Sequence, residues 1–105
     1  MDYPVIPHSR PWITDSDIEA VNSVLKSGQI SQGPKVSAFE TKLASTIGKN
    51  FAVATSSGTS ALHLALLALE VKEGDEIIIP SFVCTAVLNA VNYTRAIPRI
   101  VDIDP

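Results

Sequence analysis

The spacing of apolar residues in the first half of the chain predicts two amphipathic helices. The first follows the N-cap residue types Thr14 and Asp15 and ends at Gly28. The second begins near Pro34, which suits a first helical turn, and Gly48 closes it. The residues that form the apolar faces are Ile18, Val21, Val24 and Leu25 in the first helix and Val36, Phe39, Leu43 and Ile47 in the second. The segment between the helices is expected to be a glycine-bounded loop.

The second half of the chain alternates between β-prone and helix-forming segments. Compact runs of apolar and β-branched residues predict strands, and longer runs with helix-forming residues predict helices. The expected elements are a strand at 51–55, a helix at 61–70, a buried strand at 77–79, a helix at 81–93 and a strand at 98–102. Because strands that alternate with helices pair in parallel, the pattern predicts an α/β fold with an incomplete, mostly parallel sheet and flanking helices.

The proline-rich first segment is expected to behave differently from the rest of the chain. Residues 1–13 contain Pro4, Pro7 and Pro11, which fix φ and remove hydrogen-bond donors, so they are expected to form an extended N-terminal arm. Residues 14–105 are expected to form one partial α/β domain. Three short strands are few for a sheet that must be covered on both faces. We therefore expect the chain to be the front part of a larger α/β protein.

Composition narrows the possible partners and the location. Eight Lys and Arg residues against eleven Asp and Glu residues, with no basic cluster, argue against a nucleic-acid partner. No apolar run approaches the roughly 20 residues that span a bilayer, so no membrane segment is predicted. The single cysteine, Cys84, cannot form an internal disulfide, and the chain does not start with a basic and apolar leader. A cytoplasmic location is expected, and no metal site is predicted.

The turn from Ser56 to Ser60 has the chemistry of an anion site. It follows a predicted strand and precedes a predicted helix, whose first N–H groups have no partners and carry the positive end of the helix dipole. Small residues let a ligand approach the backbone, hydroxyl groups add donors, and Gly58 is expected to allow an unusual backbone conformation. The same residue types also cap helices in general. On spacing alone, both interpretations stay open.

Several blocks of sequence, taken in order, resemble one family of enzymes. The chain looks like the DegT/DnrJ/EryC1/StrS aminotransferases, pyridoxal-phosphate enzymes that aminate keto-sugars attached to nucleotides, although relatives of this family also dehydrate. The blocks that carry the resemblance are Ser9–Pro11, Gly33–Val36, Phe39–Glu40, Ser57–Leu66, Gly74–Ile78, Pro80–Phe82 and Val101–Asp104. The resemblance implies that residues 14–105 are part of the large domain of a fold type I pyridoxal-phosphate enzyme.

The resemblance also assigns roles near the cofactor. In this family a turn of the Ser-Gly-Thr-Ser-Ala type holds the cofactor phosphate, which implies that Gly58, Thr59 and Ser60 do so here. Four residues after the proline of the next block, the family usually has an aromatic ring that stacks on the cofactor. Cys84 occupies this position, and a thiol packs as a small polarizable group but offers no flat π-face. The stacking at Cys84 must therefore differ from that of the family.

Substrate contacts are expected in the first half of the chain. The loop from Ser27 to Pro34 matches a family segment that lies near the active site and the dimer partner, which implies a substrate-facing role for Ile30, Ser31 and Gly33. A simple helix-to-helix connection is the alternative. Arg10 could hold a phosphate of the nucleotide-sugar because a guanidinium binds phosphate in a bidentate manner, and a surface role is its alternative.

The resemblance implies that the chain lacks its catalytic lysine. Transamination needs a Schiff-base lysine, and in the family this residue comes later in the sequence. None of the lysines matches its position, and these are Lys26, Lys35, Lys42, Lys49 and Lys72. No catalytic residue is therefore assigned, and the chain alone is expected to be inactive.

The family's strand order predicts how this chain assembles. In the family the first strand of the sheet does not neighbour the second and third, so 51–55 is expected to lack a partner within this chain. Its exposed edges predict a homodimer or a higher oligomer.

The sequence leaves two alternative functions open for this chain. One is a non-catalytic remnant or oligomerisation module of the same fold. The other is a small nucleotide-binding α/β module, which is disfavoured because the turn lacks both Gly-x-Gly-x-x-Gly and the Gly-Lys-Ser/Thr phosphate loop.

Overall fold

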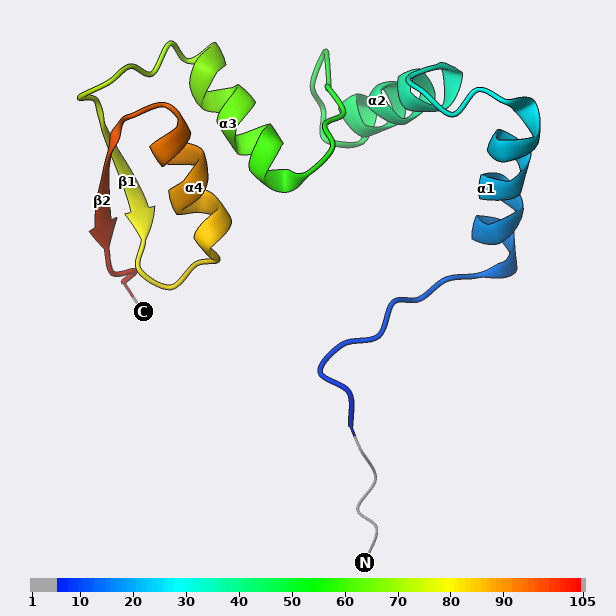
Figure 1. The fold of residues 1–105 in the computed structure, drawn as a ribbon, viewed down its shortest axis with the longest axis horizontal. Helices are drawn as coiled ribbons and strands as arrows, with labels where there is room; N and C mark the ends of the chain where they lie inside the picture. The colour runs from blue at the N-terminus through cyan, green and yellow to red at the C-terminus, as the bar shows by residue number, and fades with distance from the viewer. Residues whose placement is uncertain (1–5, 105) are drawn as a thin grey trace, which may run out of the picture. The chain divides into compact units, whose positions relative to one another are not determined.

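The computed structural model describes residues 6–104, which contain four helices and two strands (Figure 1). The elements are α1 (Asp15–Ser27), α2 (Pro34–Thr46), α3 (Gly58–Ala68), β1 (Glu76–Pro80), α4 (Thr85–Tyr93) and β2 (Ile97–Val101). The chain divides into two compact units, Met1–Phe39 and Glu40–Pro105. Residues 6–14 belong to no helix or strand. No helix in the described range has the length and apolar content needed to cross a membrane.

The first unit is organised by well-capped helix ends. At the start of α1, the Thr14 amide donates to the Asp17 carboxylate at 2.8 Å, and the Asp17 amide donates to the Thr14 hydroxyl at 3.4 Å. Hydrogen bonds from the Thr14 backbone and side chain lower the pKa of Asp17, because they stabilise the charged carboxylate. At the other end, Gly28 adopts a φ of 72° and its amide donates to the Leu25 carbonyl. Both predicted boundaries of α1 are confirmed.

Helix α2 begins at the predicted residue and crosses from the first unit into the second. Pro34 is its first residue, and Gly48, with a φ of 66°, lies just after its end. The Lys49 amide closes the turn by donating to the Ala44 carbonyl at 2.9 Å. Ala44 is the buried residue of α2, and most of the predicted apolar face is exposed.

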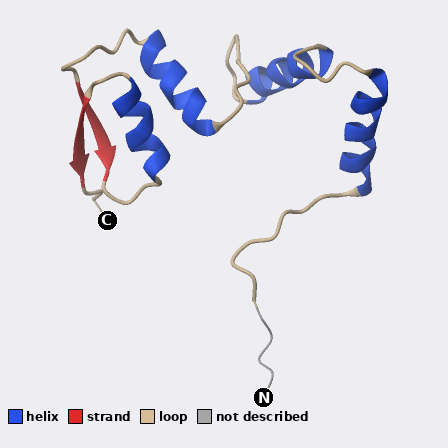
Figure 2. Ribbon diagram, viewed as in Figure 1, coloured by secondary structure: helices blue, strands red, loops and turns tan. Residues whose placement is uncertain are grey.

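The second unit is built on a parallel pair of strands, as predicted. β1 and β2 pair in register from Glu76 opposite Ile97 to Pro80 opposite Val101. Helix α4 connects them and packs against both strands and against α3 (Figures 1 and 2). The Arg99 guanidinium beside Glu76 lowers the pKa of that carboxyl group by hydrogen bonding and charge.

A small apolar core lies between α4 and one face of the sheet. Its buried members are Ile79, Val91 and Ala96. The partly buried residues packed around them are Leu66, Val71, Ile77, Val87 and Leu88. The expectation of a strand buried on both faces is wrong for β1, because Ile79 is 4% exposed whereas Ile78 is 72% exposed. Side chains alternate between the faces of a strand, and α4 covers only one of them.

The predicted strand at 51–55 and the predicted start of the helix at 81–93 are also wrong. Residues 51–55 form no strand, because no strand among residues 6–104 pairs with them, and this lack of a partner is what the family's strand order implied. Helix α4 starts at Thr85 rather than at Ser81. The Ser81 amide donates to the Val101 carbonyl at 2.7 Å and its hydroxyl donates to the Asp102 carboxylate. These bonds hold Ser81 against the end of β2 and keep it out of the helix.

Candidate functional site

The turn before α3 is held by a network of hydroxyl groups. Ser57 is the N-cap of α3, and its side chain accepts a hydrogen bond from the Ser60 amide at 3.1 Å. The Ser60 hydroxyl lies 3.0 Å from that of Ser57 and 3.4 Å from that of Ser56. The Thr55 hydroxyl donates to the Ser57 carbonyl at 2.9 Å. The turn therefore does cap α3, and Ser57 is the capping residue.

Capping leaves two backbone donors available at the same place. The Ser60 amide is taken by Ser57, and the Ala61 amide donates to the Ser57 carbonyl at 3.0 Å. The amides of Gly58 and Thr59, the first two residues of α3, have no acceptor among residues 6–104. Two adjacent free N–H groups at a helix N-terminus suit an anion. A phosphate fits this set of donors, which also includes the hydroxyl of Thr59.

The expected role of Gly58 as a conformational exception is wrong. Its φ lies outside the left-handed region, since only Gly28, Gly48 and Gly74 have positive φ values among the described glycines. A Cβ built on Gly58 would meet no heavy atom within 4 Å. The backbone at Gly58 is therefore open to an approaching ligand. The absence of a side chain, and not an unusual backbone conformation, is what glycine provides at this position.

The segment that leads into this turn is fixed from α2. The Ala54 amide donates to a carboxylate oxygen of Glu40 at 2.8 Å in a partly buried contact. Both residues belong to the second unit. In the sequence, Glu40 belongs to a block of the family pattern, but no role was predicted for it. In the structure Glu40 is half-buried and lies four residues before the buried Ala44, so its side chain faces the protein.

Cys84 lies at the start of α4, where it is the N-cap residue. Its side chain makes no capping hydrogen bond, and its thiol is free and exposed. A thiol with no capping bond is available for packing against a ligand. The predicted contact between Cys84 and a cofactor stays a prediction, as do the contacts predicted for Gly58, Thr59 and Ser60.

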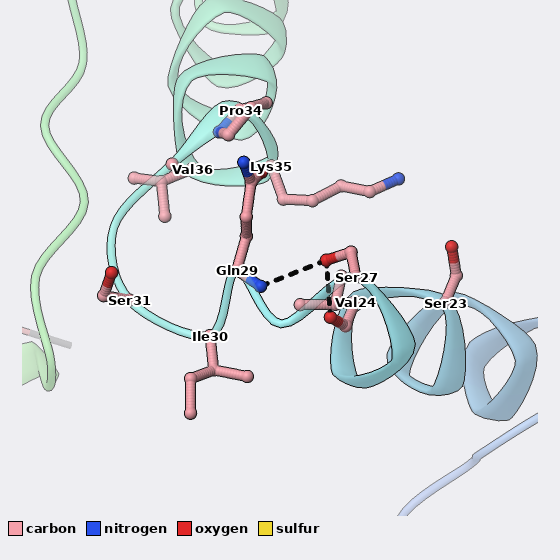
Figure 3. Close-up of a pocket in the computed structure, with 10 residues that line it drawn as sticks. Ser23, Val24, Ser27, Gln29, Ile30, Ser31, Pro34, Lys35 and Val36 are labelled. Carbon is pink, nitrogen blue, oxygen red and sulfur yellow. Dashed lines mark hydrogen bonds between the residues drawn. The ribbon is translucent and has the colours of Figure 1, made fainter.

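The loop between α1 and α2 lines a cavity of about 320 Å³ within the first unit (Figure 3). Ile30, Ser31 and Gly33 are among its lining residues, so the structure brings three of the four predicted substrate-facing residues together. The Ser27 hydroxyl shapes the start of the loop by accepting from the Gln29 amide and donating to the Val24 carbonyl. Arg10, the fourth residue, is exposed and does not line the cavity.

One aromatic contact in the second unit joins α3 to α4. The His63 ring on α3 lies 5.3 Å from the Tyr93 ring on α4, at a tilt of 57°. This contact supports packing between the two helices.

Among residues 6–104, no group of three or more His, Cys, Asp or Glu side chains is arranged to hold a metal ion.

Sequence comparison decides the family. Residues 11–105 match the sequence model of the DegT/DnrJ/EryC1/StrS aminotransferase family. The chain belongs to this family. The match covers almost the entire chain, so the resemblance inferred from the blocks of sequence is confirmed.

Solved structures of DegT/DnrJ/EryC1/StrS relatives share the fold. A protein from Streptococcus pneumoniae assigned as a sugar aminotransferase, in its PLP form, has a TM-score of 0.89 and 39% identity over 94% of this chain and 25% of its own. An aminotransferase from Psychrobacter cryohalolentis has a TM-score of 0.86 and 35% identity over 93% of this chain and 26% of its own. The predicted pyridoxal-phosphate aminotransferase fold is confirmed.

A dehydratase is also similar to this DegT/DnrJ/EryC1/StrS chain. The E. coli GDP-4-keto-6-deoxy-D-mannose-3-dehydratase with bound hydrated PLP has a TM-score of 0.81 and 34% identity over 91% of this chain and 26% of its own. This chain therefore spans about a quarter of the length of the solved structures that it matches. Since an aminotransferase and a dehydratase are both similar, the likeness covers two types of reaction.

Proposed function

We propose that this chain anchors the cofactor phosphate in a pyridoxal-phosphate enzyme that acts on nucleotide-linked keto-sugars. The observation that carries the proposal is the pair of free amides of Gly58 and Thr59 at the N-terminus of α3. Support comes from the family match over residues 11–105 and from the similar protein in its PLP form. Amination is the favoured reaction of the whole enzyme, because it is the activity for which the family is named.

The proposed roles divide between the backbone and the side chains of the turn. The amides of Gly58 and Thr59 donate to the phosphate, and the hydroxyls of Thr59 and Ser60 add further donors. Ser57 keeps the Ser60 amide occupied, so the turn stays ordered when no anion is bound. When bound, pyridoxal phosphate would supply an electron sink for chemistry at the substrate's amino or keto carbon.

Cys84 and the residues of the first unit have proposed roles in binding. Cys84 packs against the cofactor as a polarizable group in place of an aromatic ring. Ser31 and Gly33 contact the nucleotide-sugar from the cavity that they line. Arg10 binds one of its phosphate groups, since its exposed guanidinium is a bidentate donor. The free thiol agrees with a cytoplasmic location, which forms part of the same proposal.

We also propose that this chain alone forms no covalent bond with the cofactor. Among the described residues, no hydrogen bond joins a lysine side chain to the turn at 56–60. We expect pyridoxal phosphate to bind reversibly and the chain alone to catalyse no transamination. A covalent adduct with the chain that one lysine substitution abolishes would contradict this part of the proposal.

Binding of pyridoxal phosphate, compared with pyridoxal, tests the phosphate anchor directly. Equilibrium dialysis should show binding of pyridoxal phosphate and much weaker binding of pyridoxal, which lacks the phosphate. Gly58→Ala should weaken the binding of pyridoxal phosphate by about tenfold, because the added methyl group costs the phosphate one charge-assisted hydrogen bond. Since space around Gly58 is open, this variant should stay folded. Equal binding of both ligands would reject the anchor.

Self-association is proposed as the way in which exposed apolar residues of the sheet are covered. Ile78 in β1 and Ile100 in β2 are large apolar residues with exposed fractions of 72% and 63%. Apolar surface of this kind is typical of an interface. Sedimentation at micromolar concentration should give a dimer or a larger species. A monomer that melts cooperatively at that concentration would contradict the proposal.

A further inference from the structure

We propose that Glu40 is a positioning residue for the phosphate turn, and that it acts through the hydrogen bond its carboxylate accepts from the Ala54 amide. The inference deepens the proposed function and rests on it, because it assumes that the turn at 56–60 binds phosphate. It assigns a role to a side chain that does not itself belong to the turn. Glu40 lies on α2, whereas the turn precedes α3.

The contact between Glu40 and Ala54 links separate parts of the second unit. It joins residues fourteen positions apart at 2.8 Å and is partly buried. By contrast, the capping bonds of Thr14 and Ser57 join residues three positions apart. A carboxylate that accepts from a backbone amide makes a charge-assisted bond, and its strength increases where water is partly excluded. This contact can therefore fix the segment in place.

The segment at 51–55 needs such an anchor because it has no strand partner among residues 6–104. Its exposure alternates along the chain, with Ala52 and Ala54 half-buried and Phe51 and Val53 exposed. This alternation is typical of an extended strand with one face against the protein. In a sheet, the Ala54 amide would donate to a neighbouring strand. Glu40 takes the place of that acceptor.

The hydrogen bonds continue from Ala54 into the turn. Ala54 is followed directly by Thr55, whose hydroxyl donates to the Ser57 carbonyl, and Ser57 in turn caps α3. Fixing Ala54 therefore limits where Ser56 and Ser57 can lie around the free amides of Gly58 and Thr59. A turn that is ordered before binding loses less conformational entropy when the anion binds. Without Glu40, phosphate binding would have to order this segment.

The test compares Glu40→Ala, which removes the acceptor, with Glu40→Gln, which keeps an oxygen acceptor of similar geometry. Pyridoxal phosphate should bind about tenfold more weakly to Glu40→Ala, a factor that corresponds to about 1.4 kcal/mol. Glu40→Gln should bind within about twofold of the wild type, since its amide oxygen still accepts from Ala54. Glu19→Ala, which removes a carboxylate from an exposed position of α1, is the matched control and should leave binding unchanged.

A second measurement separates positioning from general stability. In amide hydrogen exchange and NMR, Glu40→Ala should lose protection at Ala54 and shift the amide resonances of Gly58 and Thr59, and Glu40→Gln should restore both. Unchanged phosphate affinity in Glu40→Ala, whatever its melting temperature, would overturn the inference. If Glu40→Ala does not fold, Glu40→Asp, whose shorter side chain withdraws the carboxylate from the Ala54 amide, takes its place, and unchanged phosphate affinity in that variant overturns the inference.

Failure of the proposed function gives a different result from failure of this inference. If the wild-type chain binds no pyridoxal phosphate and no inorganic phosphate, the proposed function fails. The positioning role is then decided by the Gly58 and Thr59 amide resonances alone. Their shift in Glu40→Ala and recovery in Glu40→Gln would support the role, and unchanged resonances would reject it.

Discussion

Replacement of Ile79 by alanine is expected to lower the free energy of unfolding of the second unit by about 2–5 kcal/mol. Ile79 is 4% exposed and lies with Val91 and Ala96 in the only buried apolar cluster found among residues 6–104. Truncation removes buried methyl and methylene groups and leaves a cavity that the small core can refill only in part. Urea unfolding followed by far-UV circular dichroism measures the change.

The adjacent isoleucine provides a control of the same chemistry in the same strand. Ile78 is 72% exposed in the single chain, so at protein concentrations low enough to keep the chain monomeric, Ile78→Ala should change the free energy of unfolding by no more than about 0.5 kcal/mol. The comparison removes effects of β-propensity, because both substitutions replace isoleucine with alanine within β1. If the two variants lose equal stability, the core assigned to this face of the sheet is wrong.

Local patterns in the sequence were enough to predict the helices and the parallel strands. The ends of α1 depend on Thr14 and Gly28, whose effects act within a few residues. The parallel pairing of β1 with β2 follows from the single helix that connects them. Such features need no knowledge of distant parts of the chain, which explains why their prediction succeeded.

Features that depend on a neighbour were predicted less well. Residues 51–55 have the composition of a strand, but no strand among residues 6–104 lies beside them, as the family's strand order implied, and a strand is defined by its pairing. The run from Ile77 to Ile79 gave no sign that only one face would be covered. Ser81 resembles a helix start, but its bonds to Val101 and Asp102 place it at the end of the sheet. In each case the outcome depends on tertiary contacts.

The candidate site shows the same division between local and distant features. The turn at 56–60 was found from the sequence as a candidate anion site, because a helix N-terminus with small residues is a local signal. The distinction between the Ser57 cap and the free amides of Gly58 and Thr59 required the structure. Glu40 was missed because the carboxylate and its partner Ala54 are fourteen positions apart. A side chain that acts through a distant backbone amide leaves no periodic pattern in the sequence.

The Thr59→Asp variant should change folding and phosphate binding in opposite directions. Thr59 is the second residue of α3, where a carboxylate interacts favourably with the helix dipole and should raise the free energy of unfolding by about 0.3–1 kcal/mol. The same charge would lie at the proposed phosphate position and repel the anion. Since opposing like charges cost several kcal/mol, the affinity for pyridoxal phosphate should fall by at least about 100-fold.

The opposite signs of these two effects make Thr59→Asp a sharp test, because an affinity lost through unfolding would come with lower stability. Ser16→Asp is the matched control, since Ser16 is the second residue of α1 as Thr59 is of α3. It adds the same charge at the same helix position and should leave the affinity for pyridoxal phosphate unchanged. Equilibrium dialysis and thermal melting of both variants give the two quantities. A Thr59→Asp protein that binds pyridoxal phosphate as tightly as the wild type would remove α3 from the phosphate site.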